Sequence, residues 1–208
     1  MSRSPHYSQE MTTPLTRICV FCGAADGKRS SYRAAADVLG TEMAKRGITL
    51  IYGGGSLGIM GGVADAVLKG GGQVTGVITT QLVAKEVAHK SLSKLHIVET
   101  MHQRKKMMAD MADGFVTLPG GLGTLDEFFE ILAWAQLGIH AKPVGILNTD
   151  GYFDGLLKFV EQMAADGFLR INLREALQVD DDAARLLDRM SQHKPASISP
   201  FRPESNPV

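Results

Sequence analysis

Residues 48–62 read ITLIYGGGSLGIMGG, an apolar run followed by a glycine-rich loop and the start of an amphipathic segment. The run Ile48–Tyr52 is typical of a fully buried strand, and a helix is predicted from about Ile59 to Leu68. A second stretch repeats this order. Gly114–Leu118 is another apolar run, and a second glycine loop leads from it into a helix predicted over Leu125–Leu137. The order strand, glycine loop, helix indicates an α/β protein.

The same alternation of apolar runs and amphipathic segments extends along most of the chain. The remaining predicted strands are Arg17–Cys22, Val74–Ile78, Leu95–Val98, Pro143–Leu147 and Leu177–Val179, and the remaining predicted helices are Ser31–Arg46, Thr100–Ala112, Tyr152–Ala165 and Asp181–Ser191. Continuous apolar strands separated by helices indicate a parallel sheet that is covered on both faces. With right-handed crossovers, the predicted fold is a single-domain, Rossmann-like, doubly wound sheet in three α/β/α layers.

The composition limits the classes of partner. The 208 residues include 22 Lys plus Arg and 22 Asp plus Glu, so the formal net charge is zero. This balance argues against a protein held on nucleic acid or on an anionic membrane by bulk charge. The domain is predicted over residues 15–194, between tails at 1–14 and 195–208 that are predicted to be disordered. Neither a secretory signal nor a membrane-spanning run is visible, so a cytoplasmic location is expected.

The two cysteines, Cys19 and Cys22, have the CxxC spacing of some zinc and redox sites. Both fall in the predicted buried strand, and no second Cys/His pair has the spacing of metal ligands. Buried core thiols are therefore the favoured interpretation, and no metal site is expected.

Both glycine loops connect a strand to a helix, which places them at the carboxyl edge of the sheet, where ligands bind in such folds. Without a Cβ, backbone N–H groups can approach an anion closely, and the start of a helix adds unpaired N–H donors. Two such loops at one edge of the sheet suggest a site that binds a whole nucleotide. The alternative is that the glycines only form tight turns. The absence of a Walker lysine, and of an acidic residue closing the next strand, disfavours P-loop enzymes and dehydrogenases.

Glu127 follows the second glycine loop and allows two interpretations. Thr124 and Glu127 have the spacing of a capping box, in which the glutamate only stabilises the start of the helix. Alternatively, a carboxylate beside bound phosphate would face the ribose of a 5′-nucleotide. There it could stabilise an oxocarbenium-like transition state or activate water. Glu86 is a second candidate carboxylate.

Three consecutive cations open the helix predicted over residues 100–112. Arg104 and Lys105 could pair with phosphate or with a departing base. Three adjacent residues cannot share one face of a helix, so at least one of these cations is expected to be solvated.

Four segments together resemble the signature of the Lonely Guy family, the cytokinin riboside 5′-monophosphate phosphoribohydrolases. They are Tyr52–Gly61 (YGGGSLGIMG), Met101–Lys105 (MHQRK), Pro119–Glu127 (PGGLGTLDE) and Trp134–Gly145 (WAQLGIHAKPVG). The resemblance extends from about residue 18 to residue 190, which is nearly all of the predicted domain.

The resemblance implies hydrolysis of an N6-substituted adenosine 5′-monophosphate to free base and ribose 5-phosphate, without metal or cofactor. It implies that Arg104 and Glu127 are the catalytic pair. The substrate-binding residues that it implies are Glu86, Lys105, Gly120, Gly121, Leu122, Gly123 and Thr124. In the first glycine loop, Gly54, Gly55, Ser56 and Met60 are further predicted substrate-binding residues. It also implies a homodimer or larger homo-oligomer, with the helix Leu125–Leu137 at the interface.

Four positions depart from the family's common pattern, namely Ala24, Ala25, Thr79 and Ala133. They bear on substrate preference more than on the type of reaction. The family's older label, lysine decarboxylase, is disfavoured because that chemistry normally uses pyridoxal phosphate on a lysine, and neither glycine loop contains one. Two other functions stay open: a non-catalytic nucleotide-binding or carrier protein, and a general AMP nucleosidase.

Overall fold

The computed structural model describes residues 15–83 and 88–198. The predicted tail at 1–14 and residues 199–208 of the predicted tail at 195–208 lie outside the described residues, as does the candidate Glu86. Residues 195–198, which the sequence places in the C-terminal tail, are described. There the Ser197 N–H donates to Glu175 Oε2 over 2.8 Å, and Ile198 forms an isolated antiparallel bridge with Ile171.

The centre of the molecule is a parallel sheet with the strand order β4-β3-β2-β1-β5-β6-β7. The strands are β1 (Arg17–Phe21), β2 (Thr49–Tyr52), β3 (Val74–Thr79), β4 (Lys94–Val98), β5 (Gly114–Thr117), β6 (Val144–Leu147) and β7 (Leu177–Asp180). Every pairing in this sheet is parallel, and all seven predicted strands are confirmed. The predicted doubly wound α/β fold is therefore confirmed.

Helices lie between successive strands, and α8 follows the last strand. They are α1 (Ser30–Lys45), α2 (Gly58–Lys69), α3 (Thr80–Val83), α4 (Met101–Met111), α5 (Leu122–Gln136), α6 (Asp154–Ala165), α7 (Leu173–Ala176) and α8 (Ala183–Ser191), with a 3-10 turn, η1, at Thr149–Gly151. The short elements α3, η1 and α7 were not predicted, because a single turn shows no helical periodicity in the sequence. Within the described residues, no helix is both long and apolar enough to cross a bilayer.

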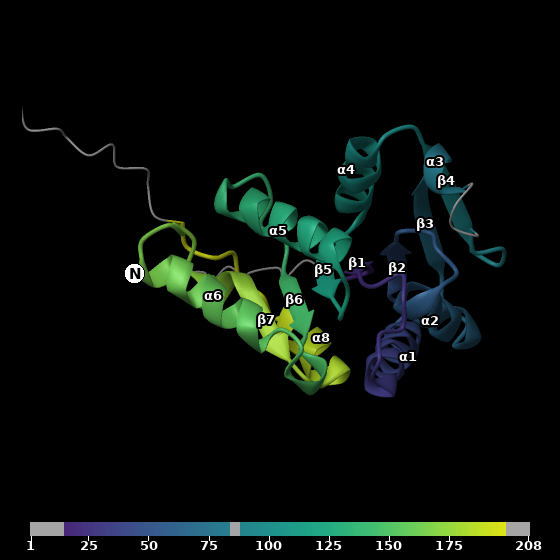
Figure 1. Cartoon of the computed structure of the whole chain (residues 1–208), viewed down its shortest axis with the longest axis horizontal. Helices are drawn as coiled ribbons and strands as arrows, with labels where there is room; N and C mark the ends of the chain where they lie inside the picture. Colours follow the sequence, from purple (N-terminus) through teal and green to yellow (C-terminus); the bar gives the residue numbers. More distant parts are fainter. Residues whose placement is uncertain (1–14, 84–87, 199–208) are drawn as a thin grey trace, which may run out of the picture.

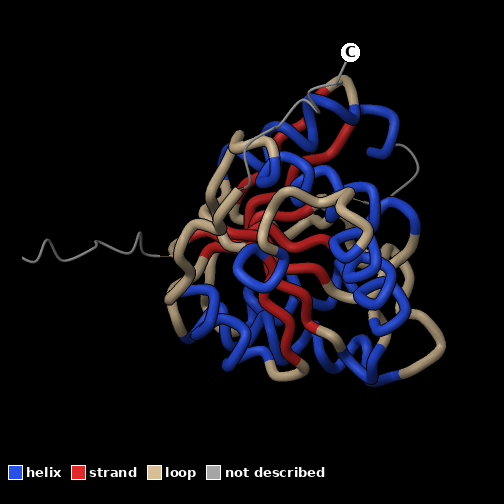
Figure 2. Tube along the Cα trace, turned by 90° about the vertical axis from the view of Figure 1, so that its left-hand side faces the viewer, coloured by secondary structure: helices blue, strands red, loops and turns tan. Residues whose placement is uncertain are grey.

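Helices cover both faces of the sheet, as Figures 1 and 2 show. One core packs α1, α2 and α8 against the sheet and includes Val20, Leu39 and Val63. The other packs α4 and α5 against the opposite face and includes Phe115 and Phe128. Alternate residues of β1, β2 and β5 enter the two cores, which explains why these central strands are largely apolar. The edge strand β4 instead leaves Leu95 and Ile97 exposed.

The order of the strands reverses direction between β1 and β5. The chain runs from β1 outward to β4, and α4 then returns it to β5, which pairs with β1 from Ile18↔Gly114 to Phe21↔Thr117. The loops after β1 and β5 therefore diverge to opposite faces of the sheet. Such a switch point opens a crevice beyond the carboxyl ends of the strands, and both predicted glycine loops end there.

Candidate active site

Three loops are joined by backbone hydrogen bonds at the switch point. The Gly23 N–H, just after β1, donates to the Pro119 carbonyl after β5 over 3.0 Å. The Gly23 carbonyl accepts from the Met60 N–H in the first turn of α2 over 3.1 Å. A Cβ on Gly58 would lie 2.4 Å from the backbone of Ala24, so only glycine allows the β2–α2 loop to approach so closely. The two glycine loops are thus held in one fixed arrangement.

Arg104 reaches this arrangement from α4 and is buried. Its Nε donates to the Val77 carbonyl of β3 over 2.9 Å, and its Nη1 lies 2.9 Å from Glu127 Oε1. A Cβ on Gly53 would lie 2.0 Å from Arg104 Nη2, so the first glycine loop makes room for the guanidinium. The structure therefore brings together Arg104 and Glu127, the two residues predicted to be catalytic.

Helix α5 begins at Leu122, three residues earlier than predicted, and this overturns the capping box. The N-cap residue is Gly121, without a side-chain cap, and Thr124 is a buried residue of the first turn. Glu127 consequently lies in the second turn and faces Arg104 across the interface between α4 and α5. Sequence reasoning failed here because Gly-Leu-Gly has low intrinsic helix propensity, which tertiary contacts override.

The start of α5 has the properties of an anion site. The first N–H groups of a helix have no intrahelical acceptor, and the helix dipole places positive charge there. Cβ atoms on Gly121 and Gly123 would meet nothing within 4 Å, so this side of the loop is open. A phosphate at this position would be held by backbone donors.

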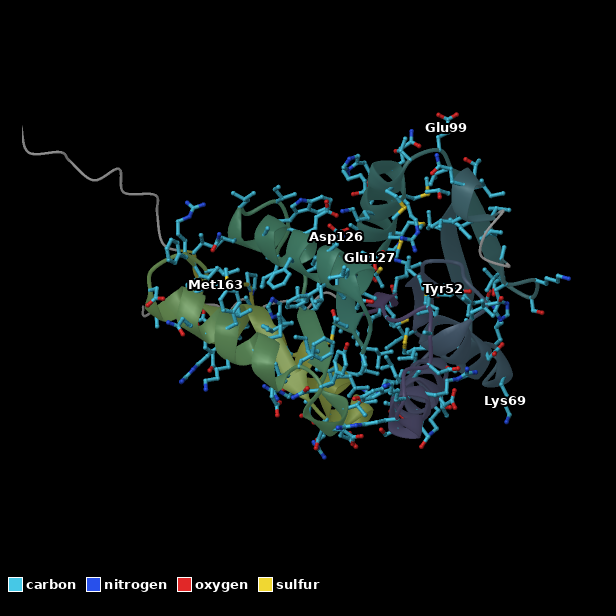
Figure 3. All side chains as sticks on the ribbon, in the orientation of Figure 1. Tyr52, Lys69, Glu99, Asp126, Glu127 and Met163 are labelled. Carbon is cyan, nitrogen blue, oxygen red and sulfur yellow. The ribbon has the colours of Figure 1, made fainter. Side chains whose placement is uncertain are left out.

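Burial perturbs the ionisation of Glu127. The pKa of its carboxyl group is raised above the usual value, chiefly because burial disfavours the charged form, although Arg104 opposes the shift. Asp126 lies beside it on α5, close to α4 (Figure 3), and its Oδ2 is 3.0 Å from Lys105 Nζ. The two neighbouring carboxylates therefore have different environments: the Asp126 side chain is mostly exposed, and that of Glu127 is 11% exposed.

The raised pKa of Glu127 predicts the acid limb of the pH–rate profile. If the ionised carboxylate is the active form, activity falls as the pH drops through the folded-state pKa. We therefore expect the acid limb of kcat/KM to lie above the ordinary glutamate pKa of 4.5. Measurement between pH 4 and 9, with unfolding followed in parallel, checks this. A limb at or below the ordinary glutamate value would contradict it.

A cavity of about 310 Å³ opens at this place. Its described lining residues are Cys22, Gly23, Ala24, Met60, Leu82, Met101, Arg104, Gly121, Gly123, Thr124, Asp126 and Glu127. Six of the predicted site residues are among them: Arg104, Glu127, Met60, Gly121, Gly123 and Thr124. The volume lies at the lower end of the range for small-molecule sites.

Six other predicted site residues are absent from the described lining of this cavity. Lys105 Nζ is bonded to Asp126 and to Glu130, at 3.0 and 3.1 Å, and its side chain is 11% exposed. Gly54 packs beside Ile78, and Gly55 bridges to Ala88. Gly120, Leu122 and Ser56 are likewise absent from the described lining. The roles predicted for these six residues, and for the six that line the cavity, stay predictions.

Sequence reasoning missed several residues that line the cavity, above all Cys22 and Gly23. The available signal was their position at the carboxyl end of β1, the strand beside the switch point. Leu82 lies where no motif marks it, and Met101 opens the segment Met101–Lys105 but was not predicted as a site residue. The prediction that both cysteines are buried thiols is confirmed, since Cys19 and Cys22 are free and buried. Among the described residues, no group of three or more His, Cys, Asp or Glu could hold a metal ion.

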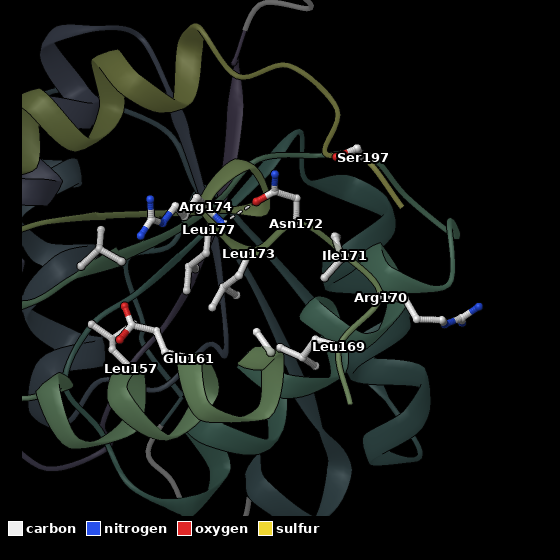
Figure 4. Close-up of a pocket in the computed structure, with 12 residues that line it drawn as sticks. Leu157, Glu161, Leu169, Arg170, Ile171, Asn172, Leu173, Arg174, Leu177 and Ser197 are labelled. Carbon is white, nitrogen blue, oxygen red and sulfur yellow. Dashed lines mark hydrogen bonds between the residues drawn. The ribbon is translucent and has the colours of Figure 1, made fainter. Parts of the chain in front are cut away.

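A larger groove, of about 930 Å³, lies between α6, α7 and the edge strand β7 (Figure 4). Leu157 and Glu161 of α6 line one side, and Leu173 and Leu177 line another. It shares no lining residue with the cavity at the switch point. The smaller cavity is the candidate active site because it combines a buried carboxylate, a buried guanidinium and a helix start.

Comparison with known proteins identifies the family. A family model described as "Possible lysine decarboxylase" matches residues 60–190. A probable cytokinin riboside 5′-monophosphate phosphoribohydrolase of Oryza sativa subsp. japonica is 53% identical over 86% of this chain and 79% of that protein. A cytokinin riboside 5′-monophosphate phosphoribohydrolase of Arabidopsis thaliana is 47% identical over 88% of this chain and 85% of that protein. The chain belongs to the Lonely Guy family.

Solved structures of lower sequence identity share the fold. The molybdenum cofactor carrier protein of Chlamydomonas reinhardtii superposes with a TM-score of 0.65 at 21% identity, covering 86% of this chain and 97% of that one. The protein TM1055 superposes with a TM-score of 0.64 at 24% identity, covering 86% and 99%. Both similarities support the α/β architecture alone.

Proposed function

We propose that this protein hydrolyses the N-glycosidic bond of N6-substituted adenosine 5′-monophosphates and releases the free base and ribose 5-phosphate. The observation that carries the proposal is the buried Arg104–Glu127 pair beside the open start of α5. Relatives at 53% and 47% identity bear the name of this activity. The 5′-phosphate would bind the backbone N–H groups of Gly121–Thr124, which leaves the ribose facing the carboxylate.

The reaction needs charge of both signs at the sugar. As the bond from C1′ to the base nitrogen breaks, its electrons leave with the base, and positive charge develops on the ribose. Glu127 stabilises that charge and accepts the proton of the water whose oxygen bonds to C1′. Arg104 orients Glu127 through its 2.9 Å contact and offsets negative charge on the leaving base.

Product analysis tests the proposal directly. Purified protein incubated with isopentenyladenosine monophosphate, AMP, GMP and CMP is expected to release free base and ribose 5-phosphate in equal amounts, fastest from the isopentenyl substrate. Apolar side chains in the cavity, including Met60, Leu82 and Met101, favour an apolar N6 substituent. Equal kcat/KM for AMP and its isopentenyl derivative would indicate a general AMP nucleosidase instead.

Two other functions are disfavoured by the residues at the site. Lysine decarboxylation ordinarily uses pyridoxal phosphate bound to a lysine. No lysine is among the described residues that line the cavity, and Lys105 forms ion pairs with Asp126 and Glu130.

A non-catalytic carrier would bind nucleotide through the loops alone and would not need a carboxylate buried against Arg104. Binding of a monophosphate without release of base from any substrate would favour the carrier.

We further infer that the protein acts in the cytoplasm as a homodimer or larger homo-oligomer, with α5 at the interface. Two buried free thiols suit a reducing compartment. Leu137 and Ile139, at the end of α5, are more than half exposed, and Trp134 is only partly buried. Sedimentation at several protein concentrations tests the association, and Leu137→Glu is expected to weaken it.

A further inference from the structure

We propose that Tyr152 is a positioning residue that sets the orientation of the loop Gly120–Thr124, which is proposed above to bind the phosphate. This inference rests on the proposed function. Tyr152 follows β6 and lies in the turn between η1 and α6, far from the glycine loops in sequence. Its hydroxyl donates a hydrogen bond to the Gly120 carbonyl oxygen over 2.6 Å. Gly120 precedes the N-cap residue of α5, so Tyr152 contacts the loop at its start.

Fixing the Gly120 carbonyl also fixes the next N–H group. The Gly120 carbonyl and the Gly121 N–H belong to one planar trans peptide unit, and they point in opposite directions. The described residues contain no cis peptide bond. With the carbonyl held by Tyr152, the Gly121 N–H points away from Tyr152, and Gly121 lines the cavity. The hydrogen bond therefore orients one of the donors proposed to bind phosphate.

The loop needs such a constraint because of its composition. Gly121 has open space where a side chain would be, and glycine allows its peptide unit to rotate more freely than other residues do. Gly120 is packed closely on other sides, since a Cβ there would lie 2.1 Å from Thr124 Oγ1 and 2.8 Å from the Gly23 nitrogen. Its carbonyl is the group that Tyr152 holds.

Tyr152 is itself held by the turn that carries it. Asn148 Oδ1 accepts from the Phe153 N–H over 2.8 Å, and Asn148 Nδ2 donates to Asp154 Oδ1 over 2.7 Å. Asp150 has a φ of 52°, a left-handed conformation that non-glycine residues seldom adopt, and its carboxylate accepts from the Ser31 hydroxyl of α1. A turn fixed on both sides of Tyr152 suits a positioning role.

The aromatic ring of Tyr152 packs edge-on against Tyr32, with 5.4 Å between the ring centroids. Tyr32 offers a matched control, because its hydroxyl forms no hydrogen bond that the described structure records. Tyr152 is 42% exposed, so loss of its hydroxyl leaves no buried polar group on the tyrosine side. Tyr152→Phe removes the hydrogen bond and keeps the ring, and Tyr32→Phe makes the same chemical change one ring away.

The test compares ligands with and without a phosphate group. For Tyr152→Phe, KM for the nucleoside monophosphate and Kd for ribose 5-phosphate are expected to rise about 3- to 10-fold, the effect of one hydrogen bond. We expect kcat and the Kd for the unphosphorylated nucleoside to stay unchanged. Tyr32→Phe is expected to match the wild type in every measurement. Thermal unfolding of each variant shows whether the fold is intact.

Each outcome separates the two proposals. Suppose that the wild type both binds and hydrolyses the monophosphate. If Tyr152→Phe then binds ribose 5-phosphate as tightly as the wild type does, the role of Tyr152 is overturned and the proposed hydrolase function stands. The role of Tyr152 is likewise overturned if Tyr152→Ala binds ribose 5-phosphate poorly while Tyr152→Phe binds it normally. The packing of the ring, and not the hydroxyl, would then be responsible for the loss of binding. If the wild type binds ribose 5-phosphate but hydrolyses nothing, the proposed function fails, and the comparison of Kd values still decides the role of Tyr152. A wild type that binds no phosphorylated ligand overturns both.

Discussion

Glu127→Gln is expected to lower kcat by about 10²- to 10⁴-fold, the range ascribed to a single general acid–base group, while the substrate Kd changes little. The amide keeps the shape of the side chain and an oxygen that can accept from Arg104 Nη1. It loses the negative charge and the capacity to take a proton from water. Kinetics under saturating substrate, together with calorimetric measurement of binding, gives both quantities.

Glu130→Gln is the matched control for this experiment. Glu130 lies one turn further along α5, its Oε1 contacts Lys105 at 3.1 Å, and it does not line the cavity. We expect this variant to retain most of its activity. If Glu127→Gln were equally active, the carboxylate would have only a structural role, and a binding or carrier function would be the better explanation.

Gly53→Ala is expected to reduce kcat/KM by about 10²-fold, although Gly53 has no functional group. A methyl group at this position would lie 2.0 Å from Arg104 Nη2, so the guanidinium must shift from its contacts with Val77 and Glu127. A displacement of about 1 Å at a catalytic group can cost two orders of magnitude in rate. Because Arg104 is buried, some loss of stability is expected as well.

Gly155→Ala is the control for Gly53→Ala. Gly155 lies in α6, and a Cβ there would meet nothing within 4 Å, so the added methyl group is expected to leave both activity and fold unchanged. Activity and thermal unfolding should be measured for both variants. Normal kcat/KM in a folded Gly53→Ala protein would show that the position of the guanidinium is not critical.

The arrangement of strands and helices could be predicted from the sequence because burial on both faces leaves a largely apolar run in the central strands. Val74–Thr79 and Val144–Leu147 are examples. The switch point followed from the same pattern, since glycine loops after strands identify the carboxyl edge of the sheet. Arg104 and Glu127 were candidates from the residues alone, the family resemblance implied that they form the catalytic pair, and the structure places them in contact.

What the sequence could not reveal depends on contacts between distant segments. Thr124 and Glu127 have the local spacing of a capping box, and only the tertiary structure shows Glu127 facing Arg104 instead. In the same way, Gly53 reads as an ordinary loop glycine until the guanidinium is seen against it. The hydrogen bond of Tyr152 spans 32 residues, and no local pattern encodes it.

The double hydrogen bonding of Gly23 has a consequence for insertions and deletions. Its N–H and its carbonyl tie the segment after β1 to the segments after β5 and β2, respectively. Adding or removing one residue in any of the three would misplace the other two, because a single residue, Gly23, bonds to both neighbouring segments. Length variation among natural relatives should therefore concentrate elsewhere, for instance around Gly167 after α6, where the backbone turns without contacting the cavity.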